Sequence, residues 1–181
     1  ERNRLTTMRQ VQAAAVELFD DEGFDAVTVE HIAERAGVSP STIYRHFGTK
    51  EALVLWDERD GVADAELTAR LGHQPIVEAF RDSVVVALAE RDDLDLFARR
   101  LRLIYAQPSI WRAAAEDDLR NRGELAVAFA AVDGRRRARL GDEVQAATCL
   151  AALDVALERW QRPKQRATLT TLITEAIDAT T

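Results

Sequence analysis

Apolar side chains recur every three or four residues through nearly all of this sequence, and this spacing fixes the class of fold. Residues at three- and four-residue intervals share one face of an α-helix, whereas a half-buried strand needs strict alternation. Strand-like alternation is hard to find here. With 8 glycines and 4 prolines in 181 residues, the chain also has few of the residues that form the many turns of a sheet. The sequence therefore predicts an all-α protein.

The composition and charge are those of an ordinary globular protein. Hydrophobic residues make up 47% and charged residues 30%, and the formal net charge is −7. No apolar run approaches the roughly 20 residues that cross a bilayer, and the single cysteine, Cys149, fits a reducing compartment. We expect a cytoplasmic protein with no membrane partner. The net charge argues against nucleic acid unless the basic residues gather on one face.

About nine helices are predicted along the chain. Four of them cover about residues 6–22, 28–36, 39–47 and 50–71, and glycines end the first two. The stretch 72–75 contains a glycine and a proline and is interpreted as a linker. Further apolar stripes follow at helical spacing, with the basic loop "DGRRRARLGD" before the last two. Those last two helices are expected at about residues 142–160 and 165–179.

Two short helices joined by a tight turn are predicted near the N-terminus, which is the arrangement of a helix-turn-helix unit. Ala33 adds almost no bulk where the two helices cross. Gly37 suits the turn, because glycine takes positive φ at no steric cost. Val38 and Ile43 would then fill the small core beneath the turn.

The second helix of such a unit buries one thin edge and offers the rest to the major groove of DNA. Hydroxyl and tyrosine groups suit phosphate oxygens, and an arginine can pair with guanine through two hydrogen bonds. A solvated surface helix is the plainer alternative. The residues expected to be exposed are Ser41, Thr42, Tyr44, Arg45 and His46.

Charges within residues 1–50 are segregated, although acids outnumber bases by eight to six. The acids gather at the far end of the first helix, at Asp20, Asp21, Glu22 and Asp25. Arginines stand at the start of that helix, while Arg45 and Lys50 flank the end of the predicted reading helix. Lys50 also begins a helix, whose free amides favour phosphate. The face toward DNA can therefore be basic although the domain is not.

The stretch "AVELFDDEGFDAVTVEHIAERAGVSPSTIYRHFGTKEAL" closely resembles the DNA-binding domain of TetR-family transcriptional repressors, from about Met8 to Leu53. The resemblance implies an all-α homodimer that binds a palindromic operator in double-stranded DNA. It also implies repression that is relieved when a small molecule binds. On this chain, residues 1–50 become the helix-turn-helix domain and residues 51–181 the ligand-binding and dimerisation domain.

Carried over residue by residue, the resemblance gives eight side chains a role at DNA. Those at bases or the nearby backbone are Ser39, Ser41, Thr42 and Arg45. Those at phosphates are Thr28, Tyr44, His46 and Lys50. Pro40 stands where many relatives have Gly or Ala, which puts the contacts at that helix start in doubt. Arg2 and Arg4 would reach an adjacent minor groove.

In the C-terminal half, "RLRLIYAQPSIWRA" and "TLTTLITEAIDA" are similar to an actinobacterial TetR subgroup with acyl-CoA-responsive and mycofactocin-type regulators. This resemblance implies an elongated, largely apolar ligand such as a fatty acyl-CoA. Ligand pockets are mostly apolar with a few placed polar groups, and each candidate is more often plain core. The candidate lining residues are Phe80, Val84, Phe97, Leu101, Tyr105 and Trp111.

Arg99 and Arg102 lie three residues apart on one predicted helix and are candidates for an anionic head group. Arginines in such positions are more often solvated or paired with nearby acids. The acids at hand are Asp92, Asp93 and Asp95.

The last two predicted helices are apolar over more of their surface than a peripheral helix needs. Two copies of the chain would close a four-helix interface with them, and would set two reading helices about one DNA turn, ~34–36 Å, apart. The predicted interface residues are Leu150, Leu153, Leu157, Trp160, Leu169, Leu172, Ile173 and Ile177.

An enzyme is the first alternative, and the sequence offers it no site. The three histidines have no metal-ligand spacing, and no serine lies in a nucleophile elbow. We therefore expect no catalytic residue, no metal and no cofactor. A helix-turn-helix regulator that is controlled by a protein partner, without a small-molecule inducer, is the second alternative. The sequence does not decide between repression and activation.

Overall fold

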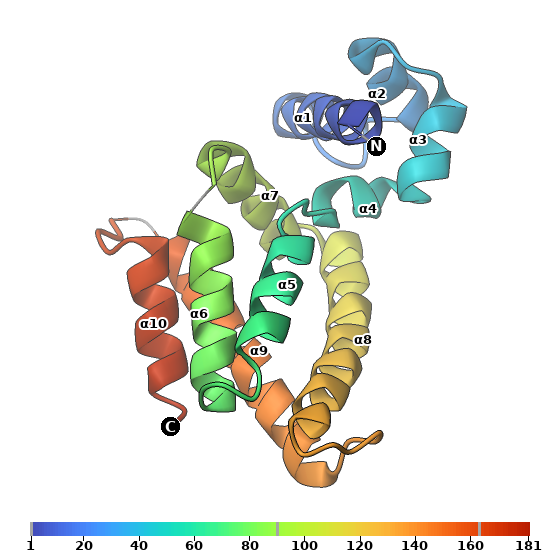
Figure 1. The fold of residues 1–181 in the computed structure, drawn as a ribbon. Helices are drawn as coiled ribbons and strands as arrows, with labels where there is room; N and C mark the ends of the chain where they lie inside the picture. The colour runs from blue at the N-terminus through green and yellow to red at the C-terminus, as the bar shows by residue number, and fades with distance from the viewer. Residues whose placement is uncertain (1, 90, 163) are drawn as a thin grey trace. The chain divides into compact units, whose positions relative to one another are not determined.

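The computed structural model describes residues 2–89, 91–162 and 164–181. Ten α-helices and no strand run through these ranges (Figure 1), so the all-α prediction is confirmed. The helices are α1 (Arg2–Glu22), α2 (Val29–Ala36), α3 (Pro40–Phe47), α4 (Lys50–Leu55), α5 (Asp60–Arg70), α6 (Ile76–Ala89), α7 (Leu94–Ala106), α8 (Pro108–Val132), α9 (Leu140–Trp160) and α10 (Leu169–Asp178).

Packing divides the chain into two compact units. The N-terminal unit comprises residues 1–58 and 93–115, and the C-terminal unit comprises residues 59–92 and 116–181. The N-terminal unit thus contains α7 and the start of α8 as well as α1 to α4. The predicted boundary between residues 50 and 51 separates functions and stays a prediction. The packing units have other boundaries.

The N-terminal unit is built around α1, whose apolar face packs on α2, α4 and α7. Val11 and Val16 on this face are fully buried. The rings of Phe19 and Phe24 lie 4.8 Å apart where α1 turns into the connection toward α2. Ile32 of α2 closes the same core. Burial of this kind contributes roughly 25 cal/mol per Å² of apolar surface.

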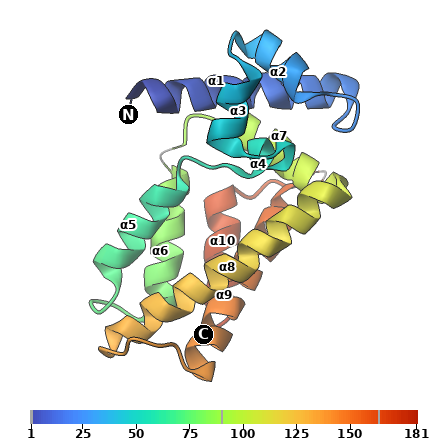
Figure 2. The ribbon, with the colours of Figure 1, turned by 90° about the vertical axis from the view of Figure 1, so that its right-hand side faces the viewer.

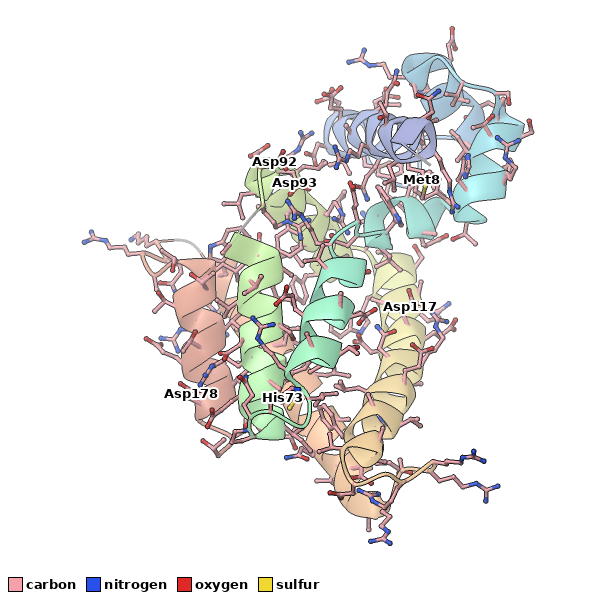
Figure 3. All side chains as sticks on the ribbon, in the orientation of Figure 1. Met8, His73, Asp92, Asp93, Asp117 and Asp178 are labelled. Carbon is pink, nitrogen blue, oxygen red and sulfur yellow. The ribbon has the colours of Figure 1, made fainter. Side chains whose placement is uncertain are left out.

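In the C-terminal unit, α10 lies beside α6 and α9 (Figures 1 and 2), and α5 packs along α6. An ion pair connects two of these helices, since Arg81 Nη1 of α6 donates to Asp178 Oδ1 of α10 at 2.7 Å. Figure 3 labels Asp178 on α10. Hydrogen bonds to Asp178 and Asp82 raise the pKa of Arg81. Cys149 is buried on α9, and burial raises its pKa to about 11.

The basic loop between α8 and α9 is held in place by one of its own arginines. Asp142 Oδ1 accepts a hydrogen bond from Arg135 Nη2 at 2.8 Å, and Asp142 Oδ2 accepts one from the Arg139 amide at 2.7 Å. These bonds lower the pKa of Asp142. Arg135 also pairs with Asp133. The loop therefore has a fixed base beneath its exposed arginines.

The prediction of one long helix over residues 50–71 is wrong. The chain forms α4 and α5 instead, and between them Trp56 takes extended backbone with φ −56° and ψ 126°. No glycine or proline lies between Lys50 and Asp60, so the sequence carries no ordinary signal for this break. This division also accounts for ten helices in the described ranges where nine were predicted.

Other helix bounds differ by a few residues from those predicted. α1 begins at Arg2 rather than near Thr6, so Arg4 belongs to the helix and not to a separate arm. The side chain of Arg2 lies outside the described part of the structure. α10 begins at Leu169, where Thr168 caps the helix by accepting the Thr171 amide at 3.2 Å. None of the helices in the described ranges is long and apolar enough to span a bilayer.

Candidate nucleic-acid interface

The turn between α2 and α3 is built as the sequence predicts. Thr28 caps α2 by accepting the His31 amide at 3.2 Å, and Ser39 caps α3 by accepting the Thr42 amide at 3.2 Å. Gly37 takes the left-handed conformation with φ 67°. The amide of the next residue then reaches back to the Ala33 carbonyl at 3.0 Å. Such a closure satisfies carbonyls that the end of a helix leaves free.

α3 buries one edge and exposes the rest, as predicted for a reading helix. Ile43 is 1% exposed and points into the core, whereas its neighbour Tyr44 is 51% exposed. Ser41 and Arg45 are exposed, and Thr42 and His46 are half-buried. A surface helix with a single fully buried residue gains little stability from packing. Packing therefore does not explain the exposed polar residues of α3.

Three hydroxyl groups gather at the start of α3. Ser39 Oγ lies 2.8 Å from Ser41 Oγ and 2.9 Å from Thr42 Oγ1. Ser39 Oγ also accepts the Thr42 amide, so its one donor and two acceptor positions are all used, whereas the hydroxyls of Ser41 and Thr42 can each form further bonds. The structure therefore brings together three of the predicted contact residues, while Thr28 stands apart at the start of α2.

Positive charge gathers at the other end of α3. The pKa of His46 is lowered, first by its partial burial and then by the positive charges of Arg45 and Arg4. Arg45 is exposed and forms no ion pair in the part of the chain that the structure describes. Arg4 lies in the first turns of α1, so α1 and α3 both contribute to this basic end.

Two acids in the last turns of α1 are paired with arginines of the N-terminal unit. Arg99 Nε of α7 donates to Asp20 Oδ2 at 2.5 Å, and Arg35 of α2 pairs with Glu17 at 3.1 Å. Arg99 Nη1 also lies 4.0 Å from Asp95 Oδ2, which confirms one of the acidic partners that the sequence suggested, whereas its partner Asp20 on α1 was not predicted. Arg102 is exposed on the next turn of α7.

Lys50 has partners that the sequence did not suggest. Its Nζ donates to the carbonyls of Phe24 at 2.6 Å and Val27 at 2.9 Å, and it lies 4.3 Å above the Phe24 ring. These bonds use two of the three donors of the ammonium group. Lys50 thus ties the start of α4 to the connection between α1 and α2. Its predicted contact with phosphate remains a prediction.

The end of α4 is closed by two side chains from other helices. Gln12 of α1 donates from Nε2 to the carbonyls of Leu53 at 2.8 Å and Trp56 at 2.7 Å. Arg100 of α7 donates from Nε to the carbonyl of Val54 at 2.7 Å and from Nη2 to that of Leu55 at 3.1 Å. Four consecutive carbonyls are therefore satisfied without another helical turn.

Arg100 is the buried member of this arrangement, with 3% of its surface exposed. Its Nη1 also donates to Asp57 Oδ2 at 3.1 Å, so the charge has an acidic partner. Its position also suits the negative end of the α4 dipole. Sequence reasoning missed Gln12 and Arg100. A signal existed for the second, because Arg100 lies three residues after Phe97, inside the apolar stripe of α7.

The candidate ligand residues are divided between the two units. Phe80 and Val84 are buried on α6 in the C-terminal unit, and Phe97 and Leu101 are buried on α7 in the N-terminal unit. Tyr105 and Trp111 do meet, with ring centroids 5.8 Å apart. They line a cavity of about 710 Å³ between the end of α7 and the start of α8. We call this the corner cavity; it is lined by Tyr105, Ala106, Gln107, Pro108, Trp111, Arg112 and Ala115.

The residues predicted for the dimer interface lie mostly inside one chain. Leu169, Leu172, Ile173 and Ile177 are buried in the C-terminal unit, where α10 packs on α6 and α9. Leu150, Leu153, Leu157 and Trp160 are half-buried on α9. The exposed apolar surface of these helices lies on another face of α9.

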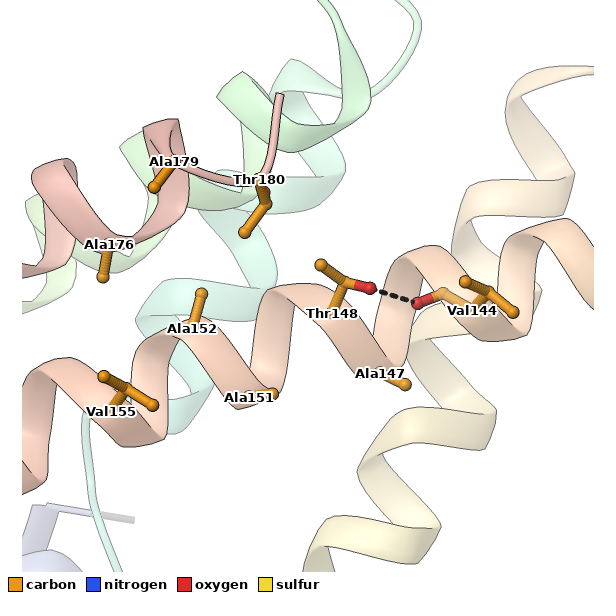
Figure 4. Close-up of a pocket in the computed structure, with 9 residues that line it drawn as sticks. All are labelled: Val144, Ala147, Thr148, Ala151, Ala152, Val155, Ala176, Ala179 and Thr180. Atoms are coloured by element: carbon orange, nitrogen blue, oxygen red, sulfur yellow. Dashed lines mark hydrogen bonds between the residues drawn. The ribbon is translucent and has the colours of Figure 1, made fainter.

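That face forms a shallow apolar hollow of about 610 Å³ along α9 and α10 (Figure 4). Val144 and Val155 are exposed at its two ends, and the small side chain of Ala151 lies between them. We call it the α9–α10 hollow; its residues are Val144, Ala147, Thr148, Ala151, Ala152, Val155, Ala176, Ala179 and Thr180. Sequence periodicity missed it because its members are mostly alanine and threonine.

Residues 12–55 match the family model described as bacterial regulatory proteins, tetR family. The HTH-type transcriptional regulator YdeS of Bacillus subtilis (strain 168) is 47% identical over 49 residues, which are 27% of this chain and 25% of YdeS. The mycofactocin biosynthesis transcriptional regulator MftR of Mycobacterium tuberculosis (strain ATCC 25618 / H37Rv) is 29% identical over 114 residues, 60% of this chain and 57% of MftR. The chain thus covers between a quarter and about three fifths of these relatives.

Among solved structures, the chain is similar to FadR of Thermus thermophilus, a TetR-family transcriptional repressor determined in complex with lauroyl-CoA. The TM-score is 0.55 and the identity 23%, over 94% of this chain and 91% of FadR. Identity at this level shows a shared fold. The likeness therefore supports the all-α architecture over nearly the whole chain.

We expect Arg100→Met to destabilise the protein by about 3–5 kcal/mol, because it removes the charge that faces Asp57 and two α4 carbonyls in a buried site. Urea unfolding followed by circular dichroism measures this loss. Arg102→Met, on an exposed position of the same helix, is the matched control and should change stability by less than about 0.5 kcal/mol. Equal stability of the two variants would contradict the role given to Arg100.

Proposed function

Because residues 12–55 match the family model of tetR bacterial regulatory proteins, we propose that this chain is a TetR-family transcriptional regulator of the cytoplasm that binds a palindromic operator as a homodimer. Its DNA-binding activity is proposed to reside in α2 and α3. The observation that carries this proposal is the surface of α3, where hydroxyls, Tyr44 and Arg45 are exposed around a single buried residue, Ile43. We propose no catalytic activity for this chain, because the matched family consists of regulatory proteins.

The chemistry of this surface suits DNA in two ways. The hydroxyls of Ser41 and Thr42 can bond phosphate oxygens, while the exposed guanidinium of Arg45 can pair with a guanine edge. The positive charges near His46 attract the phosphate backbone, although the whole chain carries −7. Binding should therefore fall steeply as salt increases, since phosphate contacts release counterions.

Dimerisation is proposed through the α9–α10 hollow. Stable interfaces bury about 800 Å² on each partner, and an exposed apolar face on two adjacent helices offers surface of the right kind. Small residues such as Ala147 and Ala151 allow the helices of a second copy to approach closely. Two copies would then present their α3 helices to successive major grooves, ~34–36 Å apart.

The corner cavity is the proposed effector site. Its volume of about 710 Å³ falls within the 300–1,000 Å³ of small-molecule sites. Two aromatic side chains supply apolar surface, and Gln107 and Arg112 supply polar groups. A fatty acyl-CoA is the proposed ligand, supported by the likeness in fold to a repressor that was determined with lauroyl-CoA. Phe80, Val84, Phe97 and Leu101 fill core space and are not needed for this proposal.

Repression relieved by ligand is the proposed mode of action. A ligand that favours a dimer whose reading helices are wrongly spaced must weaken DNA binding, and DNA must weaken ligand binding by the same factor. Lys50, Gln12 and Arg100 hold α3 and α4 on α1 and α7. The reading surface and the corner cavity consequently belong to one packed unit.

We expect the double variant Tyr44→Ala, Arg45→Ala to bind the promoter region of its own gene at least tenfold more weakly. The estimate follows from the roughly 1–3 kcal/mol of one bidentate base contact. Fluorescence anisotropy with labelled DNA measures the affinity, and light scattering checks that the dimer persists. Arg159→Ala on α9 is the control. Unchanged affinity in the double variant would show that α3 is not the reading helix.

Lauroyl-CoA is expected to release wild-type protein from the same DNA, whereas Trp111→Ala should need at least tenfold more ligand, because it removes half of the aromatic pair. Leu94→Ala, at an exposed apolar position outside the corner cavity, serves as the control. Release of Trp111→Ala at the wild-type concentration would contradict the cavity as the site. Operator binding untouched by lauroyl-CoA in wild type would contradict the acyl-CoA proposal and leave DNA binding standing.

Ala151→Glu should convert the dimer to monomers, because it places a charge in the middle of an apolar interface at a cost of several kcal/mol. Size-exclusion chromatography with light scattering gives the mass. Leu140→Glu introduces the same charge at an exposed residue of α9 outside the hollow, and should leave the mass unchanged. A dimeric Ala151→Glu protein would show that the interface lies elsewhere.

A further inference from the structure

Gly123 lies in the interior of α8, where neither packing nor backbone geometry explains a glycine. A Cβ built at this position would meet nothing within 4 Å, and its φ is not among the positive values of the chain. Glycine in a helix interior destabilises the helix relative to alanine. Two other glycines within helices, Gly61 and Gly141, stand at the second residue of α5 and α9. Gly123 therefore destabilises α8 with no gain inside the chain.

The missing side chain opens a groove on the surface of the C-terminal unit. Leu119 and Val127 lie one turn before and one turn after Gly123, and are 59% and 47% exposed. The groove has a volume of about 430 Å³. We call it the Gly123 groove; it is lined by Leu119, Arg122, Gly123, Ala126, Val127, Arg136, Arg137, Ala138 and Glu143.

Three arginines in the groove have no acidic partner among the described residues. Arg122, Arg136 and Arg137 are exposed, and within the described residues none of them forms a hydrogen bond or an ion pair. Their neighbour Arg135 behaves differently, since its pairing with Asp142 fixes the loop. Glu143 is the single acid among the lining residues. The groove is thus cationic on a chain whose net charge is −7.

From the open helix face and the unpaired arginines, we propose that the Gly123 groove binds a small organic anion with an apolar body. The guanidinium groups would hold a phosphate, sulfonate or carboxylate through paired hydrogen bonds. The apolar body would lie over Gly123 between Leu119 and Val127. A volume of about 430 Å³ suits a small molecule better than a protein segment. This site is separate from the corner cavity in sequence and does not depend on DNA binding.

Isothermal titration of the full chain with n-octyl phosphate, kept below its micellar concentration, tests the proposal. We expect one molecule bound per chain, at least tenfold more tightly than inorganic phosphate and than n-octanol, because both the charge and the apolar body contribute. No binding of octyl phosphate by the wild-type protein would overturn the proposal. Equal affinity for octanol would overturn the anionic class of ligand.

Two variants locate the binding. Arg136→Ala with Arg137→Ala removes two exposed charges, and Gly123→Leu fills the groove with a better helix former. Each should weaken octyl phosphate binding at least tenfold, while circular dichroism shows the wild-type helix content. Arg159→Ala is the matched control, since it removes an exposed arginine of the same unit outside the groove. Wild-type affinity for octyl phosphate in both groove variants would overturn the proposal.

Discussion

The exposed face of α3, which is the proposed reading surface for DNA, depends on how the end of α4 is closed. A helix that stops inside a protein leaves four carbonyls without partners, and each would destabilise the fold if buried unpaired. Here Gln12 and Arg100 satisfy the carbonyls of residues 53–56 from two different helices. Since α4 follows α3 after two residues, fixing its far end also fixes where α3 lies in the unit. A second glutamine on α1, Gln10, binds the last carbonyl of α2 in the same manner.

Charge in the N-terminal unit is arranged to keep the reading surface positive. Two acids of α1, Glu17 and Asp20, are paired with arginines of α2 and α7. Lys50 binds backbone carbonyls and strengthens the unit from within. Arg45 and Arg4 keep their charges near His46. The end of α3 is therefore basic because positive side chains gather there and the acids gather at the far end of α1, although acids outnumber bases in residues 1–50.

Local features of the sequence were enough to predict the turn and the exposed face of α3. Caps such as Ser39 and the turn residue Gly37 act within three or four positions, so their roles can be read directly. The break after α4 could not be predicted, because its causes, Gln12 and Arg100, lie 41 and 46 residues away from the carbonyls they bind. Apolar periodicity also failed to separate the core of the C-terminal unit from its surface. It selected the leucines of α9 and α10, whereas the exposed hollow is made of small residues.

The N-terminal unit is discontinuous in the sequence, and this has a consequence for synthesis. Residues 1–58 contain α1 to α4, yet Arg100, which binds two of the α4 carbonyls, belongs to a later segment. The ribosome therefore synthesises α3 well before Arg100. At about 5–20 residues per second, several seconds pass between the synthesis of α4 and that of α7. A prematurely terminated chain that lacks α7 would accordingly leave the end of α4 without Arg100 and the N-terminal unit incomplete.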